Sequence, residues 1–357
     1  MHERRERLQQ LMMQQGTRAA WIVKPENMRY LSGYTGEGGL LVCDGDCYIL
    51  TDFRYIEQAQ RESPDCIVEQ TSNIYKPAEA IHKVLRMRGI TKLAFEPEVM
   101  TVSEYNAATE ILSGIEMTAL GGLPEQLRAI KDKQEIDCII KASNIACQAF
   151  DQLLTWVKPG MTEREIQLKL DYAMMELGSE TVAFDTIACA GPNGSLPHAT
   201  PSDRPVQLGE LLTLDFGAQV NGYKCDMTRT IAIGEVSDEL RAIYDTVLMA
   251  QESAFEAIKP GAICRDIDKI ARDIIEPRYP GAFGHSLGHA VGLFIHEEPS
   301  FRGTCDATLV PGHVMTVEPG VYIPGLGGCR IEDMAIITED GYINPITAPK
   351  HLVVVSR

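Results

Sequence analysis

The chain has 357 residues, of which 45% are hydrophobic and 23% are charged, so it is long enough for two globular domains with separate cores. Its formal net charge of −17 argues against nucleic acid and anionic membranes as partners. The start of the chain is charged and amphipathic, and no apolar run is long enough to span a bilayer. Ten cysteines occur without C-x-x-C pairs, so we expect reduced thiols and a cytoplasmic protein.

The N-terminal third alternates short strands and helices. Apolar runs at 19–23 and 92–95 predict strands, and the Asp44-Gly45 dipeptide predicts a hairpin turn. No cluster of histidine, cysteine or carboxylate residues marks this part, so we assign it no chemistry. The Gly-Gly-Leu-Pro segment at Gly121–Pro124 predicts a linker. The expected domains are therefore 1–123 and 124–357.

The second part carries a repeated plan. A helix at about 133–157 ends in Lys158-Pro159-Gly160, and a helix at about 237–258 ends in Lys259-Pro260-Gly261. A second helix follows each tripeptide. The interval from Gly160 to Asp215 nearly equals the interval from Gly261 to Glu318. We interpret this repeat as an internal duplication with a pseudo-two-fold axis.

Each half ends in a predicted hairpin with one acid on each arm. In Leu211–Thr230, Asp215 and Asp226 are symmetric about the Val220–Asn221 peptide, which predicts that the two carboxylates lie side by side. Two such charges on an apolar sheet repel and lose hydration, so they need a cation. Bonding to backbone donors or to Arg229 explains one such pair as well as a metal does.

The second hairpin changes that balance. In Val317–Ile337, Glu318 and Glu332 are symmetric about Gly325, within a glycine-rich turn. Two facing hairpins would bring four carboxylates to one point, which favours bound cations. Four carboxylates with imidazoles suit two divalent ions of the Mn, Fe, Co or Zn group. Such ions lie ~3.5–4 Å apart in two-metal hydrolases, where they acidify a bridging water and polarise a carbonyl.

Histidines supply the imidazoles. His285, His289 and His296 lie in GHSLGHAVGLFIHEEP, and His198 lies in the glycine- and proline-rich loop GPNGSLPHATPSD. The interval between His198 and His296 is close to the period of the duplication. Their shared context favours a functional role over a structural one.

The series Asp215, Asp226, His289, Glu318, Glu332 resembles the dinuclear site of the M24 "pita-bread" metallopeptidases, which include methionine aminopeptidase, aminopeptidase P and prolidase. NMRYLSGYTGEGGLLV, YILTDFRYIEQA and IKDKQEI resemble the creatinase–prolidase–aminopeptidase P branch, so the resemblance covers nearly the whole chain. It implies an α+β fold. A small creatinase-type N-terminal α/β domain would precede a pseudo-two-fold pita-bread catalytic domain with a curved antiparallel sheet.

The resemblance also implies residue roles. Asp215 would chelate one metal and His289 the other, Asp226 and Glu332 would bridge them, and Glu318 would be both ligand and general base. The ions would be manganese, with cobalt, zinc or iron as alternatives. The remaining roles belong to residues around the metals: His296 would stand beside the scissile bond, His198 would contact the substrate carbonyl or leaving nitrogen, His285 would line the proline-side pocket, and Arg330 would pair with a ligand carboxylate. Cys329 and Ala290 replace the valine and glycine usual in the family.

The N-terminal domain, which methionine aminopeptidases usually lack, points to the proline-specific branch. Similar prolidases often carry an arginine four residues after the catalytic histidine, but here Ser300 stands there with Arg302 nearby. We therefore expect an Xaa-Pro aminopeptidase acting on short peptides with proline second, with Xaa-Pro dipeptidase (prolidase) as the alternative. A metal-free creatinase-like hydrolase and a non-catalytic binding protein are more remote, because the ligand set is intact. The family also implies a homodimer.

Overall fold

The computed structural model describes residues 1–355 and divides the chain into two compact units, Met1–Arg128 and Ala129–Arg357. The division falls later than the expected boundary at 123/124. The reason is that Leu123–Ala129 forms helix α6, whose Glu125 accepts hydrogen bonds from Lys24 and Asn27 in the first unit. Within the described residues, no helix is long and apolar enough to cross a membrane.

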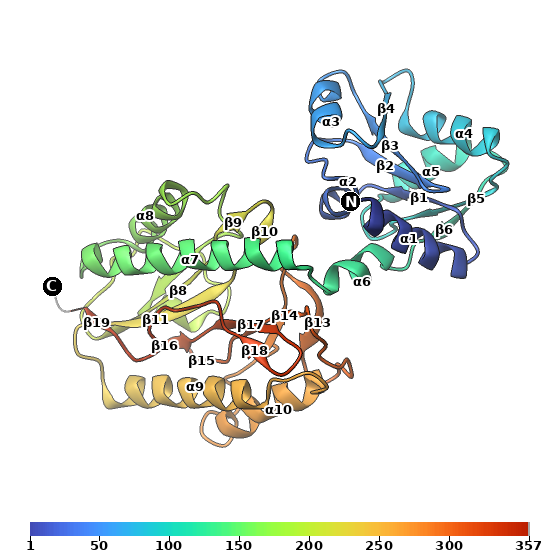
Figure 1. Ribbon diagram of the computed structural model, residues 1–357. Coiled ribbons are helices and arrows are strands. Elements are labelled where there is room, and N and C mark those ends of the chain that lie inside the picture. The colour runs from blue at the N-terminus through green and yellow to red at the C-terminus, as the bar shows by residue number, and fades with distance from the viewer. Residues whose placement is uncertain (356–357) are drawn as a thin grey trace. The chain divides into compact units, whose positions relative to one another are not determined.

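The first unit is one mixed six-stranded sheet with helices (Figure 1). The strand order is β4-β3-β2-β1-β5-β6. The predicted hairpin is confirmed, with Asp44 and Gly45 at φ 50° and 87° between β2 and β3. The elements are α1 His2–Gln14, β1 Ala19–Ile22, α2 Pro25–Ser32, β2 Gly39–Cys43, β3 Asp46–Thr51, α3 Ile56–Glu62, β4 Ile67–Gln70, α4 Pro77–Met87, β5 Lys92–Phe95, α5 Val102–Ile111, β6 Glu116–Ala119 and α6.

The second unit places antiparallel strands between two pairs of helices, with α7 and α8 on one side and α9 and α10 on the other (Figure 1). Its main sheets have the orders β19-β11-β8-β7 and β13-β12-β14-β17-β18. The elements are α7 Lys133–Trp156, α8 Glu163–Glu176, β7 Ile187–Ala190, the 3₁₀ helix η1 Gly191–Ser195, β8 Glu210–Phe216, β9 Gln219–Val220, β10 Tyr223–Lys224, β11 Met227–Ile233, α9 Asp238–Ala257, α10 Cys264–Ile275, β12 Gly288–Ala290, β13 Glu297–Phe301, β14 Val314–Val317, β15 Gly320–Ile323, β16 Gly327–Arg330, β17 Asp333–Ile337, β18 Tyr342–Ile343 and β19 Val354–Val355.

The predicted duplication is confirmed by matching backbone geometry in the two halves. Gly160 and Gly261, each after a long helix, adopt φ angles of 89° and 86°. Gly160 N donates to Val206 O and Gly261 N donates to Leu309 O, both at 2.9 Å. The strand order β7-β8-β11 of the first half is repeated as β12-β14-β17 in the second. An isolated bridge between Thr228 and Glu332 joins the halves.

The first acidic hairpin turns one residue later than predicted. Val220 pairs with Tyr223, so the turn is Asn221-Gly222, whose positive φ angles of 49° and 76° suit a tight hairpin. In this register Asp215 lies opposite Thr228, not opposite Asp226. The two aspartates are therefore diagonal neighbours on one face of the ladder rather than a directly opposed pair.

The second hairpin has the predicted register. Val317 pairs with Asp333 and Gly320 with Arg330, which centres the reversal on Gly325, at φ 80°. Glu318 follows the last residue of β14 and Glu332 precedes the first residue of β17. Both acids thus stand where the strand pairing passes from one ladder to the next.

Candidate metal centre

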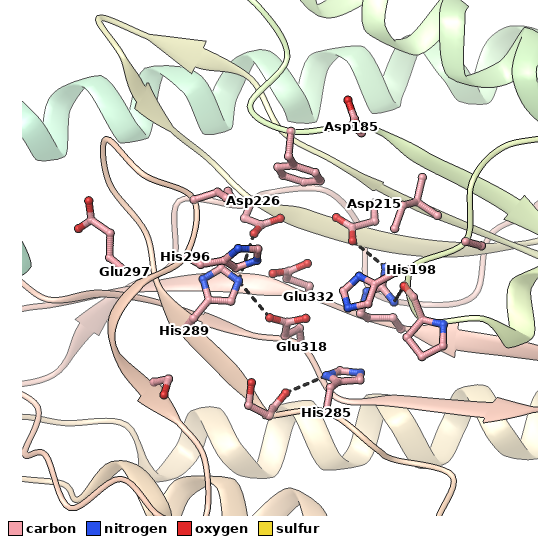
Figure 2. A pocket seen from close by; sticks show the side chains of 18 of the residues that line it. Asp185, His198, Asp215, Asp226, His285, His289, His296, Glu297, Glu318 and Glu332 are labelled. Carbon is pink, nitrogen blue, oxygen red and sulfur yellow. Dashed lines mark hydrogen bonds and ion pairs between the residues drawn. The ribbon is translucent and has the colours of Figure 1, made fainter. Parts of the chain in front are cut away.

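The four predicted acids converge at the junction of the two halves (Figure 2). Asp215 lies on β8, and carboxylate oxygens of Asp215, Asp226 and Glu332 all lie within 4.8 Å of one another. Glu318 reaches the same cluster through His289, whose Nε2 is 3.3 Å from Glu318 Oε1 and 3.6 Å from Asp226 Oδ2. Five side chains from both halves of the duplication therefore meet at one point.

Burial makes this cluster unfavourable without additional positive charge. Asp226 and Glu332 are 5% and 1% exposed, and burial, followed by the charges of neighbouring acids, raises the pKa of each well above its ordinary value. Burial also raises the pKa of Glu318 to about 8. Asp215 Oδ1 and Glu332 Oε1 are buried without a hydrogen-bond partner among the described residues. Buried carboxylate oxygens that accept no hydrogen bond are suited to divalent cations, because a cation would coordinate these oxygens and offset their charge.

The arginine alternative for the first aspartate pair is excluded by the structure. Arg229 lies beside Thr228 on β11, and side chains of adjacent strand residues point to opposite faces. Its guanidinium is 2.6 Å from Asp333 Oδ1 and also donates to the carbonyl oxygens of Glu332 and Ala348. Arg229 therefore neutralises a different carboxylate.

His289 is oriented by the backbone. Its Nδ1 lies 3.1 Å from the carbonyl oxygen of Ala290, which can only accept, so Nδ1 carries a proton and Nε2 faces the acids. Burial lowers the pKa of His289. A neutral imidazole held by a carbonyl on its other nitrogen is the form that binds metals.

The other predicted histidines surround the acids. The rings of His296 and His289 pack edge to face with centroids 4.6 Å apart. His198 lies near Asp215 in Figure 2, across the acids from that pair. His285 Nε2 is 2.9 Å from the hydroxyl of Tyr322, and burial, followed by the charge of Arg330, lowers the pKa of His285 to about 4.

Arg330 connects several of these groups. Its Nη2 donates to Asp215 Oδ2 at 2.6 Å, as the resemblance implied, and its Nη1 donates to the Tyr322 hydroxyl at 2.7 Å. The same Nη1 donates to the carbonyl oxygen of Pro197, the neighbour of His198, at 3.2 Å. One guanidinium thus holds both an acid of the cluster and the loop of a histidine.

Three supporting residues were not predicted. Tyr322 links Arg330 to His285. Thr228 donates to Glu332 Oε2 at 2.7 Å, and Thr316 donates to Glu318 Oε1 at 3.2 Å. Each threonine lies two residues from a predicted acid, Thr228 on β11 from Asp226 and Thr316 on β14 from Glu318. A polar residue two places from an acid, and so on the same face of a strand, was the signal that could have found them.

The four acids, the four predicted histidines and Arg330 line a cavity of about 580 Å³. Phe184, Ile187 and Pro197 contribute apolar surface, whereas Ser300 and Arg302 contribute polar groups. The cavity therefore combines buried acids, imidazoles, an apolar wall and a cation, which is the composition of a site for a small polar substrate.

Family comparison agrees with this geometry. Residues 137–339 match the model of metallopeptidase family M24. The chain belongs to this family. Residues 4–130 match the creatinase/prolidase N-terminal domain. An M24 metallopeptidase is a hydrolase that uses divalent metals, in keeping with the carboxylate cluster.

Individual M24 relatives align along nearly the whole chain. The Xaa-Pro dipeptidase of Pyrococcus furiosus is 38% identical, with 96% of this chain and 97% of the relative covered. The solved Xaa-Pro dipeptidase from Bacillus anthracis is 38% identical with a TM-score of 0.94, covering 99% of both chains. The solved X-Pro aminopeptidase from Thermotoga maritima is 34% identical with a TM-score of 0.90, covering 99% of this chain and 100% of the other. The expected pita-bread fold with a creatinase-type N-terminal domain is confirmed.

Proposed function

We propose that this M24 metallopeptidase hydrolyses the peptide bond before proline and that Xaa-Pro dipeptides are its preferred substrates. The aminopeptidase expected from the sequence becomes the second candidate, because the relatives named Xaa-Pro dipeptidase support the other specificity better. The observation that carries the proposal is a cation, Arg302, in the lining of the cavity that holds the acids, because the free carboxylate of a dipeptide needs a cation.

Arg302 is suited to a free carboxylate. Its Nη2 lies 3.1 Å from Glu298 Oε1, and the two side chains are 52% and 63% exposed. An exposed ion pair of this kind contributes little, so the carboxylate of a bound dipeptide can replace Glu298 at low cost. The buried Ser300 Oγ, which has no hydrogen-bond partner among the described residues, is a further donor in the same cavity.

The acids and His289 would hold the metals. Asp215, Asp226, His289, Glu318 and Glu332 offer enough oxygen and nitrogen ligands for two divalent ions. When bound, two such ions lower the pKa of a shared water and polarise the carbonyl of the scissile bond. Glu318 lines the cavity beside the other acids, where it would take the proton from the attacking water.

The histidines outside the ligand set would act on the substrate. His296 and His198 line the cavity on two sides of the acids, where they can donate to the carbonyl oxygen and to the nitrogen of the leaving proline. Neutral His285 and the apolar wall would receive the proline ring. Arg330 would hold Asp215 and the His198 loop in place.

A comparison of two substrates separates the two candidates. The aminopeptidase is favoured by Ser300, which stands where prolidases often carry arginine, and by the Thermotoga maritima relative. We expect faster hydrolysis of Xaa-Pro than of Xaa-Pro-Yaa in the presence of Mn²⁺ or Co²⁺. A preference for the longer peptide would establish the aminopeptidase, and no hydrolysis of either would refute proline specificity. Manganese as the physiological metal, the homodimer and the cytoplasmic location stay predictions.

A further inference from the structure

The loop that carries His198 depends on one buried acid that belongs to neither the metal cluster nor the cavity lining. Glu163 is the first residue of α8 and is 0% exposed. Its Oε1 accepts the backbone N–H of Ala190 at 2.9 Å. Its Oε2 accepts the side-chain amide of Asn193 at 2.7 Å, and the backbone N–H and hydroxyl of Ser202 at 3.0 and 2.7 Å.

These four donors span the whole loop. Ala190 ends β7 where the loop begins, Asn193 lies in η1, and Ser202 lies beyond His198. A single carboxylate therefore fixes the beginning and the end of the segment 190–202. Burial of a charge is tolerated here because the carboxylate is fully hydrogen-bonded and lies in the first turn of a helix.

The His198 ring itself makes no hydrogen bond to the described residues and is exposed to the cavity. Its position is therefore set by the backbone of the loop. That backbone is held at Pro197 by Arg330 and at both ends by Glu163. Without Glu163, the loop would keep the Arg330 contact and backbone hydrogen bonds such as that from Arg164 N to Ser202 O, but it would lose the four bonds that tie its two ends to one carboxylate.

The duplication shows that this acid is not required by the fold. Glu163 N donates to Arg204 O at 3.1 Å, and at the matching place in the second half Cys264 N donates to Ala307 O at 2.9 Å. The equivalent residue is thus a buried cysteine. The same backbone hydrogen bond at the start of the helix therefore forms without a carboxylate, and the acid is present only in the half that carries the His198 loop.

We propose that Glu163 is a positioning residue that sets the place of His198 in the reaction. This proposal rests on the proposed function for the role of His198. Glu163→Gln preserves shape but replaces one acceptor oxygen with an amide donor, which leaves at least one of the four loop donors unpaired. The loop then loses its fixed geometry while the metal cluster stays intact.

A double-mutant cycle tests the coupling. Kinetic constants for an Xaa-Pro dipeptide in Mn²⁺ are measured for Glu163→Gln, His198→Ala and the double variant. We expect Glu163→Gln to lower kcat about 10- to 100-fold, with KM changed less than about threefold and bound metal unchanged. In the His198→Ala background, Glu163→Gln should produce no further loss. Multiplied losses would mean that Glu163 does not act through His198, and would overturn the proposal.

Matched controls keep the test decisive. Glu165→Gln alters the same helical turn and should leave kcat unchanged, because among residues 1–355 Glu165 accepts only the backbone N–H of Thr162. If Glu163→Gln fails to fold, Ser202→Ala removes one donor from the loop side and should lower kcat in the same way but about 3- to 10-fold. A Ser202→Ala variant with unchanged kcat would count against the proposal.

An activity-independent measurement separates this inference from the proposed function. Hydrogen–deuterium exchange of the metal-loaded protein should show faster exchange in 191–202 for Glu163→Gln and unchanged exchange in β8 and β11. Equal exchange of the loop in wild type and variant would refute the positioning role. Absence of Xaa-Pro hydrolysis by the wild type would instead refute the proposed function and leave the exchange result interpretable.

Discussion

Metal removal should make the stability of the catalytic unit fall as pH rises. In the metal-free protein, burial raises the pKa of Glu318 to about 8, whereas its ordinary value is 4.5. The folded state therefore binds more protons than the unfolded state between these two values. The contribution of Glu318 to the free energy of unfolding is therefore highest below pH 4.5. It decreases progressively as the pH rises to about 8.

The size of this effect follows from the two pKa values. Ionising Glu318 in the folded metal-free protein above pH 8 lowers the free energy of unfolding by about 5 kcal/mol relative to acidic pH. The raised pKa values of Asp226 and Glu332 act in the same direction. Bound metal reverses the trend, because the ions bind the deprotonated carboxylates and stabilise the folded state more at higher pH.

Urea unfolding between pH 5 and 8.5, with EDTA or with Mn²⁺, measures this linkage. The chain has two tryptophans, and Trp156 at the end of α7 reports the catalytic unit once Trp21 in β1 is replaced by phenylalanine. Glu318→Gln is the matched control, since its metal-free form should show a shallower decline. A metal-free wild type whose stability is constant or rises over this pH range would refute the account of the buried acids.

Three further outcomes are expected. His296→Ala should lower kcat about 10²- to 10³-fold while retaining bound metal; metal loss as its main effect would mean that His296 is a ligand. Lys131→Met should lower the free energy of unfolding, measured in urea, by about 3–5 kcal/mol, because the Lys131 ammonium forms a buried 2.9 Å ion pair with Glu297. The control Lys133→Met, at an exposed position, should change this free energy little. Arg302→Ala should raise KM for Xaa-Pro about tenfold and leave KM for Xaa-Pro-Yaa unchanged; an equal rise for both peptides would remove Arg302 from carboxylate recognition.

Much of the fold could be predicted because local patterns determine it. The Asp44-Gly45 dipeptide forms the turn between β2 and β3, and the paired Lys-Pro-Gly segments end matching helices. The register of the first hairpin could not be read from the symmetry of its acids. The positive φ angles that Asn221 and Gly222 tolerate decide where the chain turns, and this local preference moved the centre by one residue.

The candidate site was predictable in its acids and histidines but not in its support. Acids on apolar strands and histidines in glycine-rich loops stand out in a sequence. Thr228, Tyr322 and Glu163 do not, because their roles arise only when distant segments fold together. Glu163 lies in the first turn of a helix, where acids are common, and its four loop donors become visible only in the structure.

Titration of the metal-free enzyme with Mn²⁺, with Xaa-Pro hydrolysis as the readout, tests the central claim most directly. The carboxylates at the junction of the halves and His289 should bind two ions per chain, so activity should be absent in EDTA and reach its maximum at two equivalents. Full activity in EDTA, or no Xaa-Pro hydrolysis at saturating metal, would contradict the account.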